Sequence, residues 1–234
     1  MIPRKIHYCW FGGNEMPELG RKCIESWKKY CPDYEIVLWN EDNYDLDACP
    51  YVREAYEAKK WAFVSDYARF DILYKHGGVY FDTDVELLKP IDEIIEKGAF
   101  MGCEVDAFEG KGLKVAPGLG IAAEAGDNIY RTILEGYHTR HFTLDDGSYD
   151  LLTVVDYTTN ILRQYGLKDC EGMQNIAGIN IYPKEYFNPF DTTTGKISTT
   201  PNTYSIHHYA ASWTSTRNKI NTKISRFINR LAGK

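Results

Sequence analysis

Apolar and polar positions in the first half of the chain follow two periods, one typical of strands and one typical of helices. An aromatic run ends at Gly12-Gly13, a helical pattern follows from Pro17 to about Tyr30, and a second apolar run covers Tyr34–Trp39. A longer helical pattern extends from Val52 to His76 and closes on Gly77-Gly78. A strand, a helix and a second strand in this order form a βαβ unit, so the pattern predicts an α/β fold.

The second half of the chain is less regular. Apolar runs predict strands at Phe100–Cys103 and Gly120–Ala123, and apolar positions at helical spacing predict helices at Asn128–Tyr137 and Thr153–Tyr165. The sequence contains neither an internal repeat nor a linker rich in Pro, Gly and Ser. We therefore predict one domain over residues 1–213, followed by a basic amphipathic helix over residues 214–234.

The composition is that of a globular protein. Of the 234 residues, 44% are hydrophobic and 26% are charged, and no apolar run approaches the roughly 20 residues that cross a bilayer. These features exclude disordered, fibrous and membrane-spanning proteins. The six cysteines form no CxxC pair, so we expect reduced thiols rather than a zinc site or a disulfide framework. Because the N-terminus lacks the apolar region of a signal peptide, we expect a cytoplasmic protein.

Charge is divided unevenly along the chain. All 33 acidic residues precede Ile206, whereas six of the 27 basic residues follow it. Between Asn218 and Leu231, apolar residues recur at helical spacing beside an arc of lysines and arginines. Two interpretations stay open. The helix packs on the domain through its apolar stripe, or it lies on an anionic membrane surface and attaches the protein peripherally to the inner face of the cell membrane.

The sharpest motif is Asp82-Thr83-Asp84, which directly follows the β-prone run Val79–Phe81. In open α/β sheets, ligands bind beyond the carboxyl ends of the strands. Two carboxylates at such an end suit Mg²⁺ or Mn²⁺, and a cation shared between carboxylates and phosphate oxygens is a common way to bind a nucleoside diphosphate. The alternative is an acidic turn with a structural role only.

Other segments add candidate chemistry. Asp66 and Arg69 are three positions apart in a mostly apolar helical pattern, so we expect them to share a face. Either they meet a polar ligand, or they form a surface ion pair that contributes little to stability. His207 and His208 are neighbours in a β-like run and point to opposite faces, which favours one metal ligand and one packing residue. Trp10 is either a core aromatic or a surface on which a nucleobase stacks.

Taken together, these segments resemble the family 32 glycosyltransferases, the DxD sugar-binding group that includes capsular and surface polysaccharide transferases and initiating mannosyltransferases. The match is carried, in the family's order, by Ile2–Gly12, Leu38–Asn40, Ala62–Arg69, Gly77–Asp84 and His207–Trp213. The resemblance implies a GT-A-type α/β/α sandwich with a Rossmann-like N-terminal half and a central mixed sheet. It also implies Mn²⁺ or Mg²⁺ as the cofactor and retention of the donor's anomeric configuration.

The resemblance further implies roles for individual residues. The catalytic residues that it implies are Asp66, Arg69, Asp82 and Asp84. The residues that it implies for nucleotide-sugar binding are Trp10, Asn40, Ser65, Asp66, Arg69, Asp82, Thr83, Ser212 and Trp213. The metal ligands that it implies are Asp84 and Asp82, together with one of His207 and His208.

The resulting hypothesis is a metal-dependent hexosyltransferase with a nucleotide-sugar donor, for which a UDP-sugar is favoured over GDP-mannose. The expected acceptor is a glycan or a lipid-linked glycan in capsular or surface polysaccharide synthesis, and no nucleic-acid partner is expected. One rival is a phosphohydrolase in which Asp82 is the nucleophile and Asp84 the acid/base, although that class places the pair near the N-terminus. The other is a carbohydrate-binding module without enzymatic activity that uses the 18 Tyr and 5 Trp as stacking surfaces.

Overall fold

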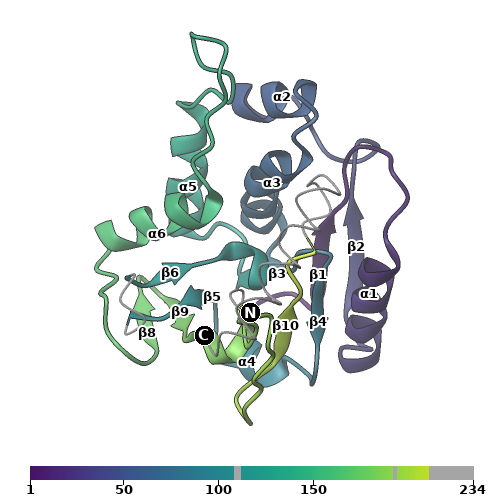
Figure 1. Cartoon of the computed structure of the whole chain (residues 1–234), viewed down its shortest axis with the longest axis vertical. Coiled ribbons are helices and arrows are strands. Elements are labelled where there is room, and N and C mark those ends of the chain that lie inside the picture. The colour runs from purple at the N-terminus through teal and green to yellow at the C-terminus, as the bar shows by residue number, and fades with distance from the viewer. Residues whose placement is uncertain (108–111, 192–193, 211–234) are drawn as a thin grey trace.

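The structure is a computed structural model that describes residues 1–107, 112–191 and 194–210, and over these residues helices cover both faces of a central mixed sheet (Figure 1). The strands of this sheet are β1 (Lys5–Cys9), β2 (Glu35–Trp39), β3 (Gly78–Tyr80), β5 (Phe100–Val105), β6 (Lys114–Val115), β7 (Ile121–Ala123), β8 (Gln174–Ile176) and β9 (Ile179–Tyr182). They lie in the order β2-β1-β3-β7-β5-β9-β8, with β6 paired to β5. β1 is parallel to β2 and β3, whereas β7 is antiparallel to β3 and β5, so the sheet is mixed.

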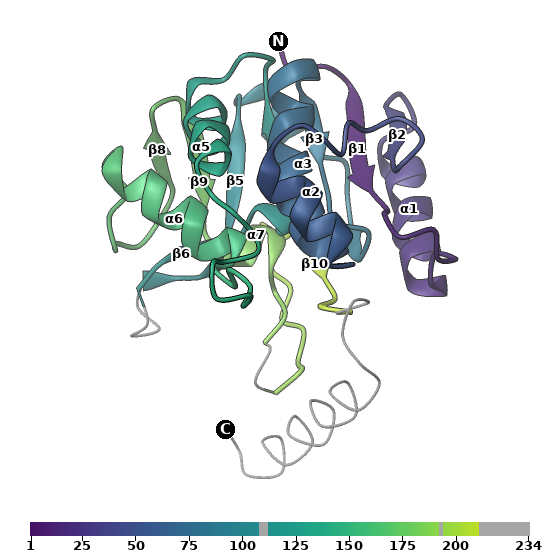
Figure 2. The ribbon, with the colours of Figure 1, turned by 90° about the horizontal axis from the view of Figure 1, so that it is seen from above.

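Helices form the two outer layers. They are α1 (Glu18–Tyr30), α2 (Pro50–Glu57), α3 (Trp61–His76), α4 (Asp92–Glu96), α5 (Asn128–His138), α6 (Val154–Gln164) and α7 (Lys184–Phe187), with a 3₁₀ turn η2 at Pro117–Leu119. Figure 2 shows α2, α3 and α5 on one side of the sheet. Side chains of α2, α3, α5 and α6 share an apolar core with Tyr80 of β3, whereas α1, α4 and α7 share another with the neighbouring Val79. The alternation of residues along β3 therefore joins the sheet to both layers.

The predicted βαβ unit is confirmed, since β1 and β2 are parallel and α1 connects them. The single helix predicted from Val52 to His76 is wrong, because it is divided into α2 and α3. Lys59 takes a φ of 56° at the break. The next amide, that of Lys60, donates to Ala55 O at 2.9 Å, which closes a turn and ends α2.

Two glycines place β3 beside β1. Gly77 ends α3 with a φ of 63°, and its N–H donates to Leu73 O at 2.8 Å. Gly78 has a φ of 107°, and a Cβ there would come within 2.9 Å of Lys5 O on β1. The chain can therefore leave the helix and enter the middle of the sheet without steric conflict, and it emerges at Asp82.

A small second sheet brings the end of the domain to the acidic motif. It consists of β4 (Val85–Leu87) and β10 (Ser205–His207), which are antiparallel and pair His207 with Val85. The indole of Trp27 on α1 is fully buried, and its Nε1 donates to Val85 O at 2.7 Å. Helix α1 therefore supports the strand against which His207 lies.

Ser212, Trp213 and the helix predicted for residues 214–234 lie outside the described residues, so these assignments stay predictions, as does the cytoplasmic location. The six cysteines all fall within the described ranges and are free thiols, with Cys170 exposed and the others buried. Among the helices that the structure describes, none combines the length and apolarity needed to cross a membrane.

Candidate active site

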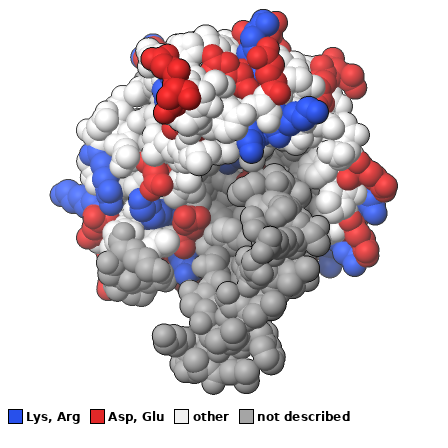
Figure 3. All heavy atoms as spheres, turned by 45° about the horizontal axis from the view of Figure 1, so that its top comes forward, with Lys and Arg blue, Asp and Glu red and all other residues white. Residues whose placement is uncertain are grey.

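A pocket of about 490 Å³ lies beyond the carboxyl ends of the parallel strands β1 and β3. Its walls come from the segments after β1 and β3, from α3, from η2, from the start of α6 and from the end of β10. On the described part of the face in Figure 3, acidic and basic side chains are interspersed. Inside the pocket, in contrast, carboxylates predominate: Glu15, Asp66, Asp82, Asp84 and Glu104. The pocket therefore favours ligands that carry or bind positive charge, or that donate hydrogen bonds.

Asp82, Asp84 and His207 form a cluster with the geometry of a metal site. One ligand atom from each of the three side chains lies within 4.8 Å of the other two. His207 Nε2 is 3.2 Å from Asp84 Oδ1 and 3.9 Å from Asp82 Oδ2. Two carboxylate oxygens and one imidazole nitrogen form a donor set that suits Mn²⁺ or Mg²⁺, so the residues present fit the cation that the sequence predicts.

The electrostatics of this cluster also favour a cation. Burial alone would raise the pKa of Asp84, but His207 and the N–H of Ala210, which donates to Asp84 Oδ2 at 2.7 Å, lower it to about 2. Burial alone would lower the pKa of His207, but Asp84 and Asp82 raise it to about 10. Positive charge is therefore stabilised between the carboxylates, and a metal ion held by these three residues would take the place of the imidazole proton.

The neighbouring His208 is directed elsewhere. Its Nε2 lies 2.8 Å from Glu86 Oε2, and its backbone N–H donates to Asp84 O at 3.0 Å. Of the two histidines, the structure therefore brings His207 to the acidic motif, as expected if adjacent residues of a strand point to opposite faces.

Asp66 and Arg69 form a buried ion pair at the wall of the pocket. Arg69 Nη2 lies 2.9 Å from Asp66 Oδ1 and 3.3 Å from Asp82 Oδ1, and the guanidinium side chain is only 4% exposed. Its Nε donates to Ser65 O at 3.0 Å. Tyr80 adds a hydroxyl that donates to Asp82 Oδ1 at 3.1 Å. The arginine therefore links the α3 face to the carboxylate that follows β3, and it holds both in fixed positions.

Burial raises the pKa of both Asp66 and Asp84, but the neighbouring charges leave the two carboxylates with different pKa values. The pKa of Asp66 is raised by burial to about 6, although Arg69 lowers it. For Asp84 the attraction of His207, together with the hydrogen bonds to the carboxylate, outweighs burial, and the pKa is lowered. Asp66 therefore binds protons near neutral pH and suits hydrogen bonding to hydroxyl groups better than it suits metal ligation.

Gly118 of η2 lies directly against Asp82. The amide of Asp82 donates to Gly118 O at 3.2 Å, and a Cβ on Gly118 would clash with Asp82 Oδ2. The same Cβ would lie 3.5 Å from Arg69 Nη1. Only a residue without a side chain therefore allows the Asp82 carboxylate to occupy its position beside Arg69.

We expect Gly118→Ala to weaken the binding of Mn²⁺ by roughly 10-fold or more, a loss of about 1.4 kcal/mol, because the added methyl displaces the free end of Asp82. The matched control is Gly120→Ala. Gly120 has a φ of 141°, and its Cβ would meet the buried Phe81 ring at 2.6 Å. This control is expected to lose about 1 to 3 kcal/mol of stability. Calorimetric titration with Mn²⁺ and thermal unfolding of both variants measure the difference, and unchanged Mn²⁺ affinity in Gly118→Ala would refute the role of Gly118.

The aromatic residues at the pocket include one predicted residue and one that the sequence analysis missed. Trp10 lines the pocket, and its Nε1 donates to Asn14 O at 2.6 Å. Trp61, at the start of α3, also lines the pocket and packs so closely on Gly12 that a Cβ there would approach its Nε1 to 2.5 Å. The glycine pair after β1 is the signal that could have indicated a close neighbour at this point.

Other predicted residues divide between the pocket and the surface. Ser65 and Thr83 line the pocket with the residues described above. Asn40 does not, because its side chain closes the turn after β2: its Oδ1 accepts from the amide of Asp42 at 3.0 Å. Glu104 and Tyr209 line the pocket without a predicted role.

Comparison with known proteins finds glycosyltransferases with which this chain shares part of its sequence. Residues 17–101 match a family model described as the glycosyltransferase sugar-binding region containing a DXD motif. Over 111 residues the chain is 32% identical to inositol phosphoceramide mannosyltransferase 1 of Schizosaccharomyces pombe, a match that covers 43% of this chain and 33% of that protein. Over 126 residues it is 31% identical to the initiation-specific alpha-1,6-mannosyltransferase of Candida albicans, covering 45% of this chain and 33% of that one. The chain thus spans about a third of the length of these curated relatives.

The fold has a counterpart among solved structures. The PaToxG glycosyltransferase superposes with a TM-score of 0.54 at 19% sequence identity, covering 70% of this chain and 69% of that chain. The predicted GT-A-type α/β sandwich is confirmed. The predicted resemblance to the DXD glycosyltransferases of family 32 is confirmed as well, through the region that contains Asp82 and Asp84.

Proposed function

We propose that this protein is a metal-dependent glycosyltransferase that moves a hexose from a nucleoside-diphosphate sugar to a glycan acceptor. The observation that carries the proposal is the Asp82, Asp84 and His207 cluster within a pocket that also holds the Asp66–Arg69 pair. A cation site next to a buried carboxylate and guanidinium matches the two parts of such a donor, a diphosphate and a polyhydroxylated sugar.

Each part of the pocket has a task in this reaction. Asp82, Asp84 and His207 would hold Mn²⁺ or Mg²⁺, which supplies the positive charge that stabilises a departing diphosphate. Asp66 accepts hydrogen bonds from sugar hydroxyls, and Arg69 orients both Asp66 and Asp82. Among the described residues that line the pocket we assign no nucleophile, so we propose that the acceptor hydroxyl attacks on the side from which the diphosphate leaves. Its proton passes to the leaving phosphate oxygen, and the donor configuration is retained.

The wall formed by Trp10 and Trp61 suits the nucleobase. Both indoles line the pocket together with Phe11 and Phe63. Flat aromatic surfaces with a polar edge bind planar bases by stacking and exclude water from the adjoining polar site. We propose a UDP-sugar as the donor, with GDP-mannose as the second candidate because two relatives carry mannosyltransferase names. The proposed acceptor is a glycan or lipid-linked glycan of a capsular or surface polysaccharide.

The function is tested by calorimetry and by product release. We expect the protein to bind one nucleoside diphosphate, UDP or GDP, in the presence of Mn²⁺, and to lose that binding in excess EDTA. A panel of UDP- and GDP-sugars then identifies the donor through slow release of the corresponding nucleoside diphosphate. Absence of nucleotide binding with Mn²⁺ would contradict the proposal and favour a carbohydrate-binding module, whereas rapid hydrolysis of simple phosphomonoesters would favour the phosphohydrolase.

A further inference from the structure

Glu104 is a pocket carboxylate that has no part in the reaction described above. It lies near the carboxyl end of β5, on a strand separated from β3 by β7, and it lines the same pocket as Asp66, Asp84 and His207. Its side chain therefore reaches the pocket from a different strand than the acidic motif does.

The carboxylate of Glu104 is held by a tyrosine that also contacts the metal cluster. The hydroxyl of Tyr209 donates to Glu104, and its ring packs edge-on against His207 with the centroids 4.2 Å apart. Tyr209 has a φ of 49°, a conformation that residues other than glycine rarely adopt. Backbone strain of this kind persists where the surroundings enforce it, and it concentrates at functional sites. Tyr209 thus connects Glu104 to His207 of the metal cluster.

The surroundings of Glu104 leave it able to accept further hydrogen bonds. Among the described residues, no lysine or arginine forms an ion pair with it, since the nearby Lys114 is paired with Asp156 instead. The backbone carbonyl of Glu104 accepts from Asn188 Nδ2 at 3.2 Å, which fixes the strand rather than the carboxylate. Burial raises the pKa of the side chain, although the attraction of His207 and the hydrogen bond from Tyr209 lower it. A carboxylate has about four acceptor positions, and one phenol hydroxyl fills only one of them.

We propose that Glu104 binds a hydroxyl group of the donor sugar and thereby contributes to the choice of sugar. The inference rests on the proposed function. A hexose attached to a diphosphate at the metal cluster carries several hydroxyl donors, and the pocket places Asp66 and Glu104 on separate elements, α3 and β5. Two carboxylates at different points around a sugar ring can distinguish sugars by the orientation of two hydroxyls. A sugar with one hydroxyl in the other orientation leaves one carboxylate without a hydrogen-bond donor and binds more weakly.

The test compares a nucleoside diphosphate with the matching nucleotide sugar. In Glu104→Gln, with Mn²⁺ present, we expect the affinity for the nucleotide sugar to fall about 10- to 100-fold, the range for a hydrogen bond to a charged group. The affinity for the nucleoside diphosphate alone should stay within about twofold, because that ligand lacks the sugar. Tyr209→Phe, which removes the hydroxyl that holds Glu104, should produce a smaller loss in the same direction.

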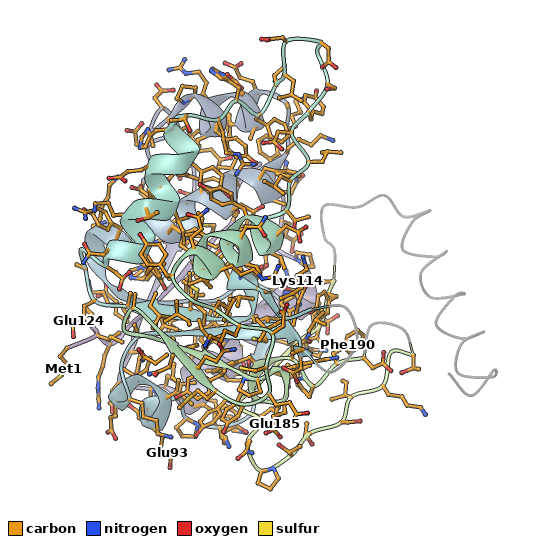
Figure 4. The ribbon with its side chains drawn as sticks, turned by 90° about the vertical axis from the view of Figure 1, so that its left-hand side faces the viewer. Met1, Glu93, Lys114, Glu124, Glu185 and Phe190 are labelled. Atoms are coloured by element: carbon orange, nitrogen blue, oxygen red, sulfur yellow. The ribbon has the colours of Figure 1, made fainter. Side chains whose placement is uncertain are left out.

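Glu124→Gln is the matched control. Glu124 is exposed and pairs with the N-terminal amine of Met1 at 2.8 Å, and Figure 4 shows it on the opposite side of the molecule from Lys114, the neighbour of Glu104. This control should bind both ligands as the wild type does. If Glu104→Gln binds both ligands like the wild type, or loses both equally, the proposal is overturned. If instead the wild type binds neither ligand, the proposed function itself fails.

Discussion

Asp84→Asn is expected to lower the rate of sugar transfer about 1,000-fold, at the upper end of what the loss of one charge-stabilising group costs. Asp84 is buried, its pKa is lowered to about 2, and both of its oxygens are directed by neighbours, Oδ1 beside His207 and Oδ2 at the N–H of Ala210. Asparagine preserves the shape and one acceptor oxygen but removes the negative charge that the cation needs. Donor binding should weaken as well, because it depends on Mn²⁺, but by less than turnover does, since Asp82 and His207 are still present to hold the cation. Steady-state kinetics with Mn²⁺ measures both quantities.

Glu86→Gln provides the control for this experiment. Glu86 lies only two residues further along the chain, in β4, but its carboxylate faces His208 at 2.8 Å rather than the pocket. Its loss should leave the transfer rate within about twofold of the wild type, since exposed ion pairs contribute little. An Asp84→Asn protein with wild-type turnover would remove the metal cluster from the mechanism.

Arg69→Met is expected to lower the free energy of unfolding by about 3 to 5 kcal/mol, the cost of leaving buried charges without their partner. The guanidinium is 4% exposed and lies within 3.3 Å of both Asp66 and Asp82. Its pKa is far above the ordinary value for arginine, because the attraction of Asp82 and Asp66 exceeds the penalty of burial, so it is charged at every accessible pH. Methionine fills much of the volume but leaves two carboxylates adjacent in a pocket wall. Denaturant unfolding at neutral pH measures the loss.

A second variant separates the charge effect from the packing effect. Asp66→Asn combined with Arg69→Met removes one of the stranded carboxylates and should recover part of the stability lost in the single variant. If the single and the double variant lose the same free energy of unfolding, the effect of Arg69→Met is due to packing. A loss below about 1 kcal/mol in Arg69→Met would show that the pair is better solvated than its burial indicates.

Helices and strands could be predicted where a short stretch of sequence determines them. Alternating apolar runs, Pro17 ahead of α1 and the glycine pair after α3 predicted the βαβ start and the strand that delivers Asp82. The break between α2 and α3 was not predictable, because the residues 57–60 are ordinary helix formers and the turn depends on Lys59 adopting a positive φ. In such a segment, tertiary packing overrides local propensity.

Residues of the site could be predicted only where several functional side chains lie together in one short sequence motif. Asp82 and Asp84 follow a strand in the sequence, so the position of their carboxylates follows from the fold class. The choice between His207 and His208 depends on which face of β10 meets β4, and alternation alone does not determine it. Glu104 belongs to the irregular half of the chain, and no motif surrounds it. Its position at the pocket arises from the strand order, which places β5 two strands from β3.

The pairing of β10 with β4 determines at which stage of synthesis and folding this site is completed. Asp84 and Ala210, which are joined by a hydrogen bond, are 126 positions apart in the sequence. During synthesis the two carboxylates leave the ribosome long before His207 does, and contacts of such long range form late in folding. Until then the acidic motif lacks its third donor. Full affinity for the cation therefore arises when His207 joins the two carboxylates, and tight metal binding can serve as a reporter of finished folding in a growing chain.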